Sequence, residues 1–147
     1  MGTNYYLQHK DPKTGRVQDL HICKTSGGWT PSLVGYNKDN NSYHLFDIRS
    51  WFDWKLFLRD QLQNKEGMIF DEYDEPWSYD EFIKHIEEWQ TVDLINGKEK
   101  QNHAEKALKG DFGTFWASSD TPYEQEMLKK NYWADPDGYS FHDGEFS

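Results

Sequence analysis

The sequence contains only one cysteine, Cys23, which excludes an internal disulfide and any zinc site built from several thiolates. No apolar run approaches the ~20 residues that span a bilayer, and residues 1–4 do not begin a signal peptide. The six histidines are scattered, and none pairs with another His or Cys at a spacing of four residues. The sequence therefore predicts no metal or other cofactor, no membrane contact and a cytoplasmic location.

Basic residues are also scarce, with 16 Lys and Arg against 26 Asp and Glu, and a net charge of -10. This charge repels nucleic acid at long range, so we expect no direct nucleic-acid binding. It favours a protein partner with a basic surface. The oligomeric state stays open.

Aromatic residues are abundant, at 17% of the chain with 7 Trp, 9 Tyr and 9 Phe. At 147 residues the chain is long enough to bury a sizeable core, so we expect a single domain over residues 1–147 with an aromatic core. Residues 90–110 lose periodicity and gain Asn, Lys, Gln and Gly, and we expect a mobile excursion there.

Hydrophobic periodicity predicts an α+β fold with a small, mainly antiparallel sheet covered on one face by two or three helices. Strands are expected over 4–9, 17–25, 29–36, 68–70 and 139–146. Helices are expected over 51–62 and 79–89, with weaker candidates at 104–108 and 123–132. Ser50 and Ser78 are the predicted N-caps of the two main helices.

The stretch from His21 to Trp29 is the first candidate site. Alternation predicts that Leu20 and Ile22 point one way and that His21 and Cys23 point the other. A glycine pair then ends the strand, beside two hydroxyls and one cation that suit an anion such as a nucleotide phosphate. A P-loop is excluded, because Cys23 occupies the position of its second glycine. The other interpretation is a plain hairpin turn covered by Trp29, and the candidate ligand-binding residues are His21, Lys24, Thr25, Ser26, Gly27, Gly28 and Trp29.

An acid/base set of His21, Lys24 and Ser26 with Asp143 or Glu145 requires the tail strand to pair with the second strand. We expect His85 to lie on the exposed side of its helix. No catalytic residue is therefore assigned.

The second candidate site is acidic. Residues 71–88 hold eight acids and one base, Lys84. One interpretation is a solvated turn and helix N-terminus, where carboxylates complement the helix dipole. The other is a surface that imitates phosphates and binds a basic groove, and its candidate partner-binding residues are Asp71, Glu72, Asp74, Glu75, Asp80 and Glu81.

Three segments carry a resemblance: Met-Gly-Thr-Asn-Tyr-Tyr at 1–6, His-Ile-Cys-Lys-Thr-Ser-Gly-Gly-Trp at 21–29, and Gly-Tyr-Ser-Phe-His-Asp-Gly-Glu-Phe-Ser at 138–147. Together they resemble a family of small, largely uncharacterised bacteriophage and prophage proteins. Cys23 departs from the family's glycine at that position. The resemblance implies a phage setting, where a small acidic accessory protein interferes with host machinery.

These observations predict a non-catalytic phage accessory protein. It would act in the host cytoplasm, binding and inhibiting a host protein, such as an antiviral-defence nuclease, through an acidic and aromatic surface. The alternative is a small-ligand or nucleotide-binding protein, or a hydrolase, that uses residues 24–29. A virion or assembly component is a third class, and self-association would reveal it.

Overall fold

A computed structural model describes residues 2–10, 15–36, 47–91, 94–95, 98–102 and 132–143. Within them the chain forms a mixed seven-stranded sheet, two helices and a separate two-stranded hairpin, which confirms the predicted α+β class. The elements are β1 (Gly2–Lys10), β2 (Val17–Ser26), β3 (Ser32–Gly35), α1 (Trp51–Asn64), β4 (Met68–Asp71), β5 (Pro76–Trp77), α2 (Tyr79–Gln90), β6 (Leu94–Ile95), β7 (Lys98–Glu99), β8 (Tyr132–Ala134) and β9 (Ser140–Asp143).

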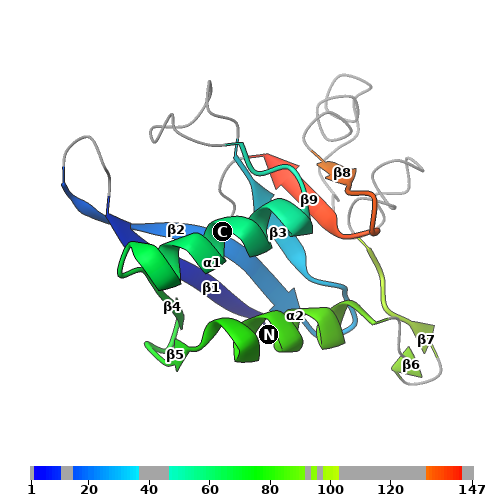
Figure 1. The fold of residues 1–147 in the computed structure, drawn as a ribbon. Helices are drawn as coiled ribbons and strands as arrows, with labels where there is room; N and C mark the ends of the chain where they lie inside the picture. Colours follow the sequence, from blue (N-terminus) through cyan, green and yellow to red (C-terminus); the bar gives the residue numbers. More distant parts are fainter. Residues whose placement is uncertain are drawn as a thin grey trace, which may run out of the picture.

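The strand order in the large sheet is β5-β4-β1-β2-β3-β9-β8. Every neighbouring pair is antiparallel except β3 and β9, which run parallel with Leu33 opposite Phe141. The N-terminal hairpin β1–β2 therefore lies at the centre, and the short hairpins β4–β5 and β8–β9 form the two ends (Figure 1).

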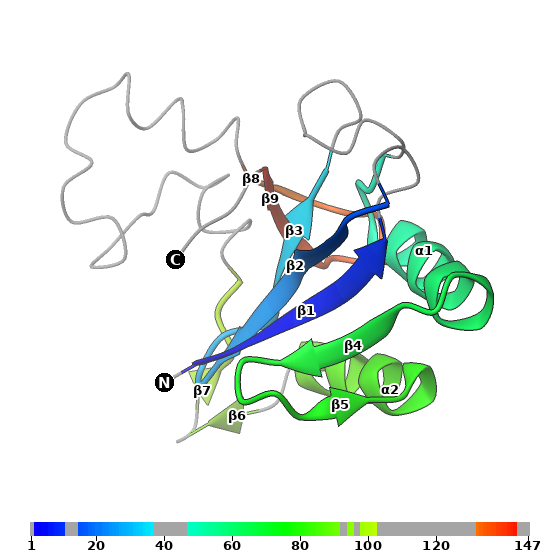
Figure 2. The ribbon, with the colours of Figure 1, turned by 90° about the vertical axis from the view of Figure 1, so that its left-hand side faces the viewer.

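Both helices lie on one face of the sheet, as the turned view shows (Figure 2). Ser50 and Ser78 cap them as predicted, with each hydroxyl accepting the backbone N–H three residues on, at Asp53 and Glu81. The Ser78 hydroxyl also donates to the Glu81 carboxylate at 2.9 Å, which holds the two side chains together at the helix start.

The core lies between this helix pair and the sheet. The helices contribute mainly aromatic and branched side chains, and the sheet contributes the inward residues of its central strands. Burying large rings is the main source of stability here, because each removes a large apolar area from water. Its largest fully buried side chains are Trp51, Trp54, Phe82, Phe141, Leu7, Leu20, Ile22, Leu33, Ile48, Leu58, Ile69 and Ile86.

A register shift in the central hairpin corrects one sequence prediction. Tyr5 lies opposite Cys23, whereas the next residue, Tyr6, lies opposite His21, so Ile22 is an extra residue on β2. Neighbours along a strand point to opposite faces and cross-strand partners share a face. His21 and Cys23 therefore lie on opposite faces of the sheet, and simple alternation fails at the bulge.

Other predictions differ at their boundaries or lie outside the described residues. The third strand begins at Ser32 rather than at Trp29, and the tail strand is described over Ser140–Asp143. The described part of 90–110 contains the β6–β7 hairpin and a bridge from Gln101 to Trp29. The helix expected at 104–108 lies outside the described residues, as does nearly all of the one at 123–132, whose last residue begins β8.

Candidate functional site

The turn between β4 and β5 is fixed by the side chain of Asp71, which is buried. Its Oδ1 accepts the backbone N–H groups of Tyr73 at 2.9 Å and Glu75 at 3.1 Å, and its Oδ2 accepts the Trp77 indole N–H at 3.2 Å. Two backbone bonds close the same turn, from Asp74 N to Asp71 O and from Asp71 N to Glu75 O. Asp71, predicted as a partner-binding surface acid, thus has its carboxylate directed inward, where it holds the turn.

The four residues that follow Asp71 face solvent. Glu72, Tyr73, Asp74 and Glu75 are all exposed, and Tyr73 keeps 64% of its surface accessible. The Glu72 carboxylate accepts the backbone N–H of Asn4 at 2.7 Å, which ties the turn to β1. Among the described residues, no cation forms an ion pair with Asp74 or Glu75. The name acidic turn is used below for residues 72–75.

The two remaining acids of the predicted set, Asp80 and Glu81, lie in the first turn of α2 and are exposed. Glu81 takes part in the cap with Ser78. Asp80 instead lines a hollow on the outer side of α2. The six predicted acids therefore divide into one buried turn anchor, three acids of the acidic turn and two helix residues.

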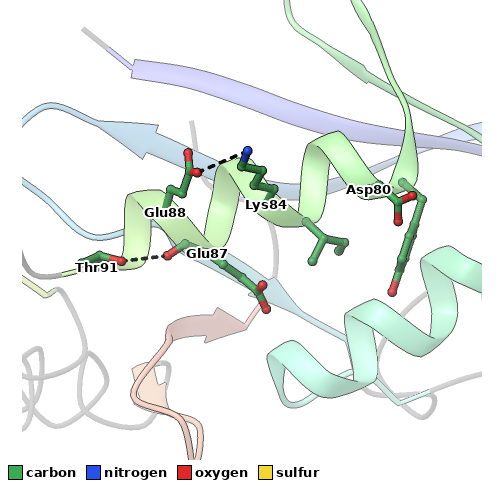
Figure 3. A pocket seen from close by; sticks show the side chains of 7 residues that line it. Asp80, Lys84, Glu87, Glu88 and Thr91 are labelled. Carbon is green, nitrogen blue, oxygen red and sulfur yellow. Dashed lines mark hydrogen bonds and ion pairs between the residues drawn. The ribbon is translucent and has the colours of Figure 1, made fainter.

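The hollow along α2 has a volume of about 380 Å³ (Figure 3). Its lining residues repeat at helical spacing and all belong to α2 or directly follow it, and Figure 3 shows Lys84 and Glu88 pointing to one side of the helix and Glu87 to the other. Glu87 joins the two helices, since its Oε2 accepts the Trp51 indole N–H at 3.1 Å and lies 3.3 Å from Lys55 Nζ. The lining residues are Tyr79, Asp80, Ile83, Lys84, Glu87, Glu88 and Thr91.

The second predicted site, around the glycine pair, is built as a structural turn. Trp29 N donates to Ser26 O at 3.1 Å, and Gly28 has a positive φ of 82°, which glycine adopts without strain. Gln101 N also donates to Gly28 O at 2.8 Å, so the segment around Gln101 stabilises the turn. Trp29 is partly buried, and its carbonyl accepts the Trp89 indole N–H at 3.0 Å.

The candidate ligand residues before that turn are divided between the two faces of the sheet. Thr25 is buried on the helix-covered side, where its hydroxyl bonds to Tyr5. His21 and Lys24 lie on the opposite side, across from Tyr6 and Asn4. Because β9 pairs with β3 and β8 rather than with β2, the condition for the acid/base set of His21, Lys24 and Ser26 with Asp143 is not met. Glu145 lies outside the described residues.

His21 is a buried, uncharged residue at neutral pH. Burial, helped by the charge of nearby Lys24, lowers its pKa to about 4, although a hydrogen bond to the backbone of Cys23 and the charge of Glu72 oppose the shift. Its ring stacks on Tyr6 at a centroid distance of 5.1 Å, and Tyr6 stacks in turn on Phe70. A ring stack thus crosses three strands on the face away from the helices.

The prediction for His85 was wrong. Its Nε2 lies 2.9 Å from the Tyr5 hydroxyl, and its ring packs between Trp77 at 4.8 Å and Trp89 at 5.9 Å. Burial lowers the pKa of His85, opposed by Glu88. His85 faces the sheet because it lies on the same side of α2 as the aromatic residues that cover the sheet.

Sequence reasoning missed three exposed apolar side chains, one in the acidic turn and two on α1. Tyr73 lies within the acidic run, and tyrosine is one of the residue types that dominate binding at protein interfaces. Phe52 and Leu56 remain 58% and 53% exposed on α1. They fall outside the helical stripe that was expected to cover the sheet, and that mismatch was the available signal.

Comparison of this chain with protein-family models, curated proteins and solved structures found no match. Within the described residues, no helix is long and apolar enough to cross a membrane. The resemblance to bacteriophage proteins stays a prediction, and function is inferred from the residues of this chain.

Proposed function

We propose that this protein is a non-catalytic binding protein whose acidic turn engages a basic surface on another protein. The observation that carries the proposal is the contrast within residues 71–75. Asp71 is buried and holds the turn through three hydrogen bonds, whereas the four residues after it are exposed. A rigid loop that presents carboxylates loses little conformational entropy on binding.

The chemistry of the turn suits a cationic partner. Glu72, Asp74 and Glu75 supply carboxylates, and the exposed ring of Tyr73 lies among them. Carboxylates attract Lys and Arg, while a central aromatic residue supplies buried contact area and often dominates binding energy. The net charge of -10 would speed the encounter with a basic surface.

In the bacteriophage setting implied by the resemblance, the partner would be a host protein in the cytoplasm. A nucleic-acid enzyme has the required basic groove, because it binds phosphates. The acidic turn would occupy that groove and inhibit the enzyme by exclusion. The small-ligand alternative receives less support, since the residues proposed for it hold a structural turn or lie on different faces of the sheet.

The test compares two variants of equal net charge. The turn variant carries Glu72→Gln, Asp74→Asn and Glu75→Gln, and the control carries Asp19→Asn, Asp60→Asn and Glu66→Gln at exposed positions elsewhere. The Glu72→Gln change keeps a side-chain acceptor for Asn4, and Asn suits the positive φ of 62° at position 74. Each tagged protein is used to capture partners from a bacterial lysate over a series of salt concentrations.

We expect the wild type and the control variant to retain the same stoichiometric protein, and the turn variant to lose it. Retention should fall as salt rises, because exposed charges are screened. Equal capture by both variants would show that total charge, and not the acidic turn, governs binding. Unchanged capture by the turn variant would reject the proposed function.

A further inference from the structure

Trp77 links the acidic turn to the interior of the protein. Its indole N–H donates to Asp71 Oδ2 at 3.2 Å, and Asp71 Oδ1 accepts the backbone N–H groups of Tyr73 and Glu75. The ring of Trp77 also packs on His85, with a distance of 4.8 Å between the ring centroids. The carboxylate that holds the acidic turn is therefore connected to the imidazole of His85 through a single side chain.

His85 is surrounded by aromatic rings. Besides Trp77, its ring lies 5.7 Å from Tyr5 and 5.9 Å from Trp89, and its Nε2 lies 2.9 Å from the Tyr5 hydroxyl. The imine nitrogen of a neutral imidazole accepts a hydrogen bond, whereas both nitrogens of an imidazolium only donate. Protonation therefore leaves the Tyr5 hydroxyl without an acceptor at Nε2, and it places a charge where little water can reach it.

The charges near His85 favour a protonated ring in water rather than in this enclosure. Burial lowers the pKa of His85, and the charge of Glu88 opposes the shift. Glu81 and Glu88 lie about one turn before and after His85 on α2, and both are exposed, so an imidazolium that turns outward meets carboxylates and water. The other titratable or charged groups around the enclosure are Tyr5 on β1, Asp71 behind Trp77, and Lys100, whose Nζ lies 5.1 Å from the Trp89 ring.

We propose that His85 makes the acidic turn sensitive to pH: protonation moves the imidazole away from Trp77 toward water, and the hold of Asp71 on the turn weakens. The Trp77 ring also packs on Tyr5 at 5.7 Å and on Phe82 at 6.5 Å, so His85 is the closest of its three ring contacts. Loss of that contact leaves the indole N–H less firmly aimed at Asp71. The imidazole position, inside or outside the ring cluster, is the element with two states.

The consequence for binding rests on the proposed function, because it concerns how the same turn engages a partner. A neutral His85 keeps the turn rigid at neutral pH, and a rigid turn loses little conformational entropy on binding. As the pH falls below the ordinary histidine pKa of ~6.5, the outward position gains population and the turn loosens. The partner would then bind more weakly in acid.

The coupling is tested without a partner, by heteronuclear NMR between about pH 7.5 and about pH 5. The signals followed are the Trp77 indole N–H, the backbone N–H groups of Tyr73 and Glu75, and the ring protons of His85. We expect the protection of the two backbone groups against hydrogen exchange, corrected for the intrinsic effect of pH, to fall about fivefold or more in the wild type. The Trp77 indole signal should shift over the same pH range as the His85 ring.

Two variants remove the charge change at His85 in different ways. His85→Gln keeps a neutral side chain that can hydrogen-bond to Tyr5, and His85→Phe keeps an aromatic ring beside Trp77. In both, the protection should change by less than about twofold over the same pH range. The matched control His21→Phe removes another buried histidine, on the face of the sheet away from the helices, and should retain the full fall. Thermal unfolding at about pH 7.5 would show that all three variants are folded.

Two results would overturn the coupling. Constant protection of Tyr73 and Glu75 in the wild type would mean that the turn does not respond to acid. An equal fall in the wild type and in His85→Gln would mean that another group controls the turn.

Partner capture at two pH values separates this inference from the proposed function. If no captured protein depends on the acidic turn at neutral pH, the proposed function fails while the coupling seen by NMR stands. If such a protein is captured, the wild type should release it as the pH falls and His85→Gln should retain more of it. Equal release by the two proteins would reject the regulatory role of His85 and leave the proposed function intact.

Discussion

Asp71 and Asp135 begin two hairpin turns at opposite ends of the sheet, in β4–β5 and β8–β9. In both, Oδ1 of the aspartate accepts the backbone N–H groups two and four residues on. In both, the residue three positions on has a positive φ, 62° at Asp74 and 86° at Gly138. Their local chemistry is therefore the same.

Their surroundings differ. Oδ2 of Asp135 accepts the backbone N–H of Trp51 at 2.7 Å, which connects its turn to the start of α1. Gln90 and Asn102 both donate to the carbonyl of Gly138. The Asp135 turn therefore accepts hydrogen bonds from several distant segments. Residues 72–75 contact the rest of the fold mainly through the bonds between Glu72 and Asn4. The Asp71 turn has the same local hydrogen bonds but fewer contacts with the rest of the fold, so it is the better candidate for binding a partner.

The largest effect is expected from Asp135→Ala. It removes the acceptor of three backbone N–H groups, two of them buried, and one of these is the N–H of Trp51, the first residue of α1, which has no acceptor within its own helix. We expect a loss of about 4 kcal/mol in the free energy of unfolding. Urea denaturation would measure it, and Asp135→Asn, which retains one carbonyl acceptor, should lose about half as much.

The turn variants have to be compared at one pH, because the low pKa of His21 makes the free energy of unfolding depend on pH. Its pKa is about 4 in the folded protein and ~6.5 when unfolded, so the unfolded chain binds more protons between these values. Stability is full above pH ~6.5 and falls as the pH drops to about 4, by up to about 3 kcal/mol. Urea denaturation of wild type and His21→Phe across this range should show a shallower fall in the variant. An equal fall in stability in wild type and His21→Phe would contradict the low pKa of His21.

Asp71→Ala should cost less than Asp135→Ala, at about 2 kcal/mol. Its donors are part-buried rather than at a helix start, so water can replace part of what is lost. The change should also loosen the acidic turn and weaken partner capture. A cost equal to that of Asp135→Ala would remove the structural distinction between the two turns.

Gly138→Ala measures the cost of placing a non-glycine residue at the positive φ of this turn. A Cβ at this position would meet no atom within 4 Å, so the cost comes from the positive φ alone and should be about 1 kcal/mol. Gly138→Asn should cost less, because Asn tolerates this conformation better than Ala. Thermal unfolding would resolve the pair, and an equal cost for both would point to another cause.

Asp74→Gly should have the smallest effect, within about 0.5 kcal/mol. Relief of the positive φ is offset by the greater freedom of glycine in the unfolded chain. The same change removes one carboxylate from the acidic turn, so partner capture should weaken while stability stays constant. A large destabilisation would mean that the Asp74 side chain supports the turn.

Much of the fold was predictable from local pattern. Ser50 and Ser78 marked the helix starts, and the apolar spacing of α1 and α2 identified the faces that cover the sheet. These predictions succeeded because capping and periodicity depend on neighbours within one or two helical turns. The parallel pairing of β3 with β9 was missed, since it joins residues more than 100 positions apart.

The candidate sites show the same division. The sequence alone determined the excess of acid, its concentration in 71–88, the α+β class and the turn character of residues 71–75. Only the tertiary structure decided that Asp71 points inward, that a bulge separates His21 from Cys23, and that His85 packs against Tyr5. The physical reason is that the types and order of residues set charge and local geometry, whereas burial depends on which distant elements pack together.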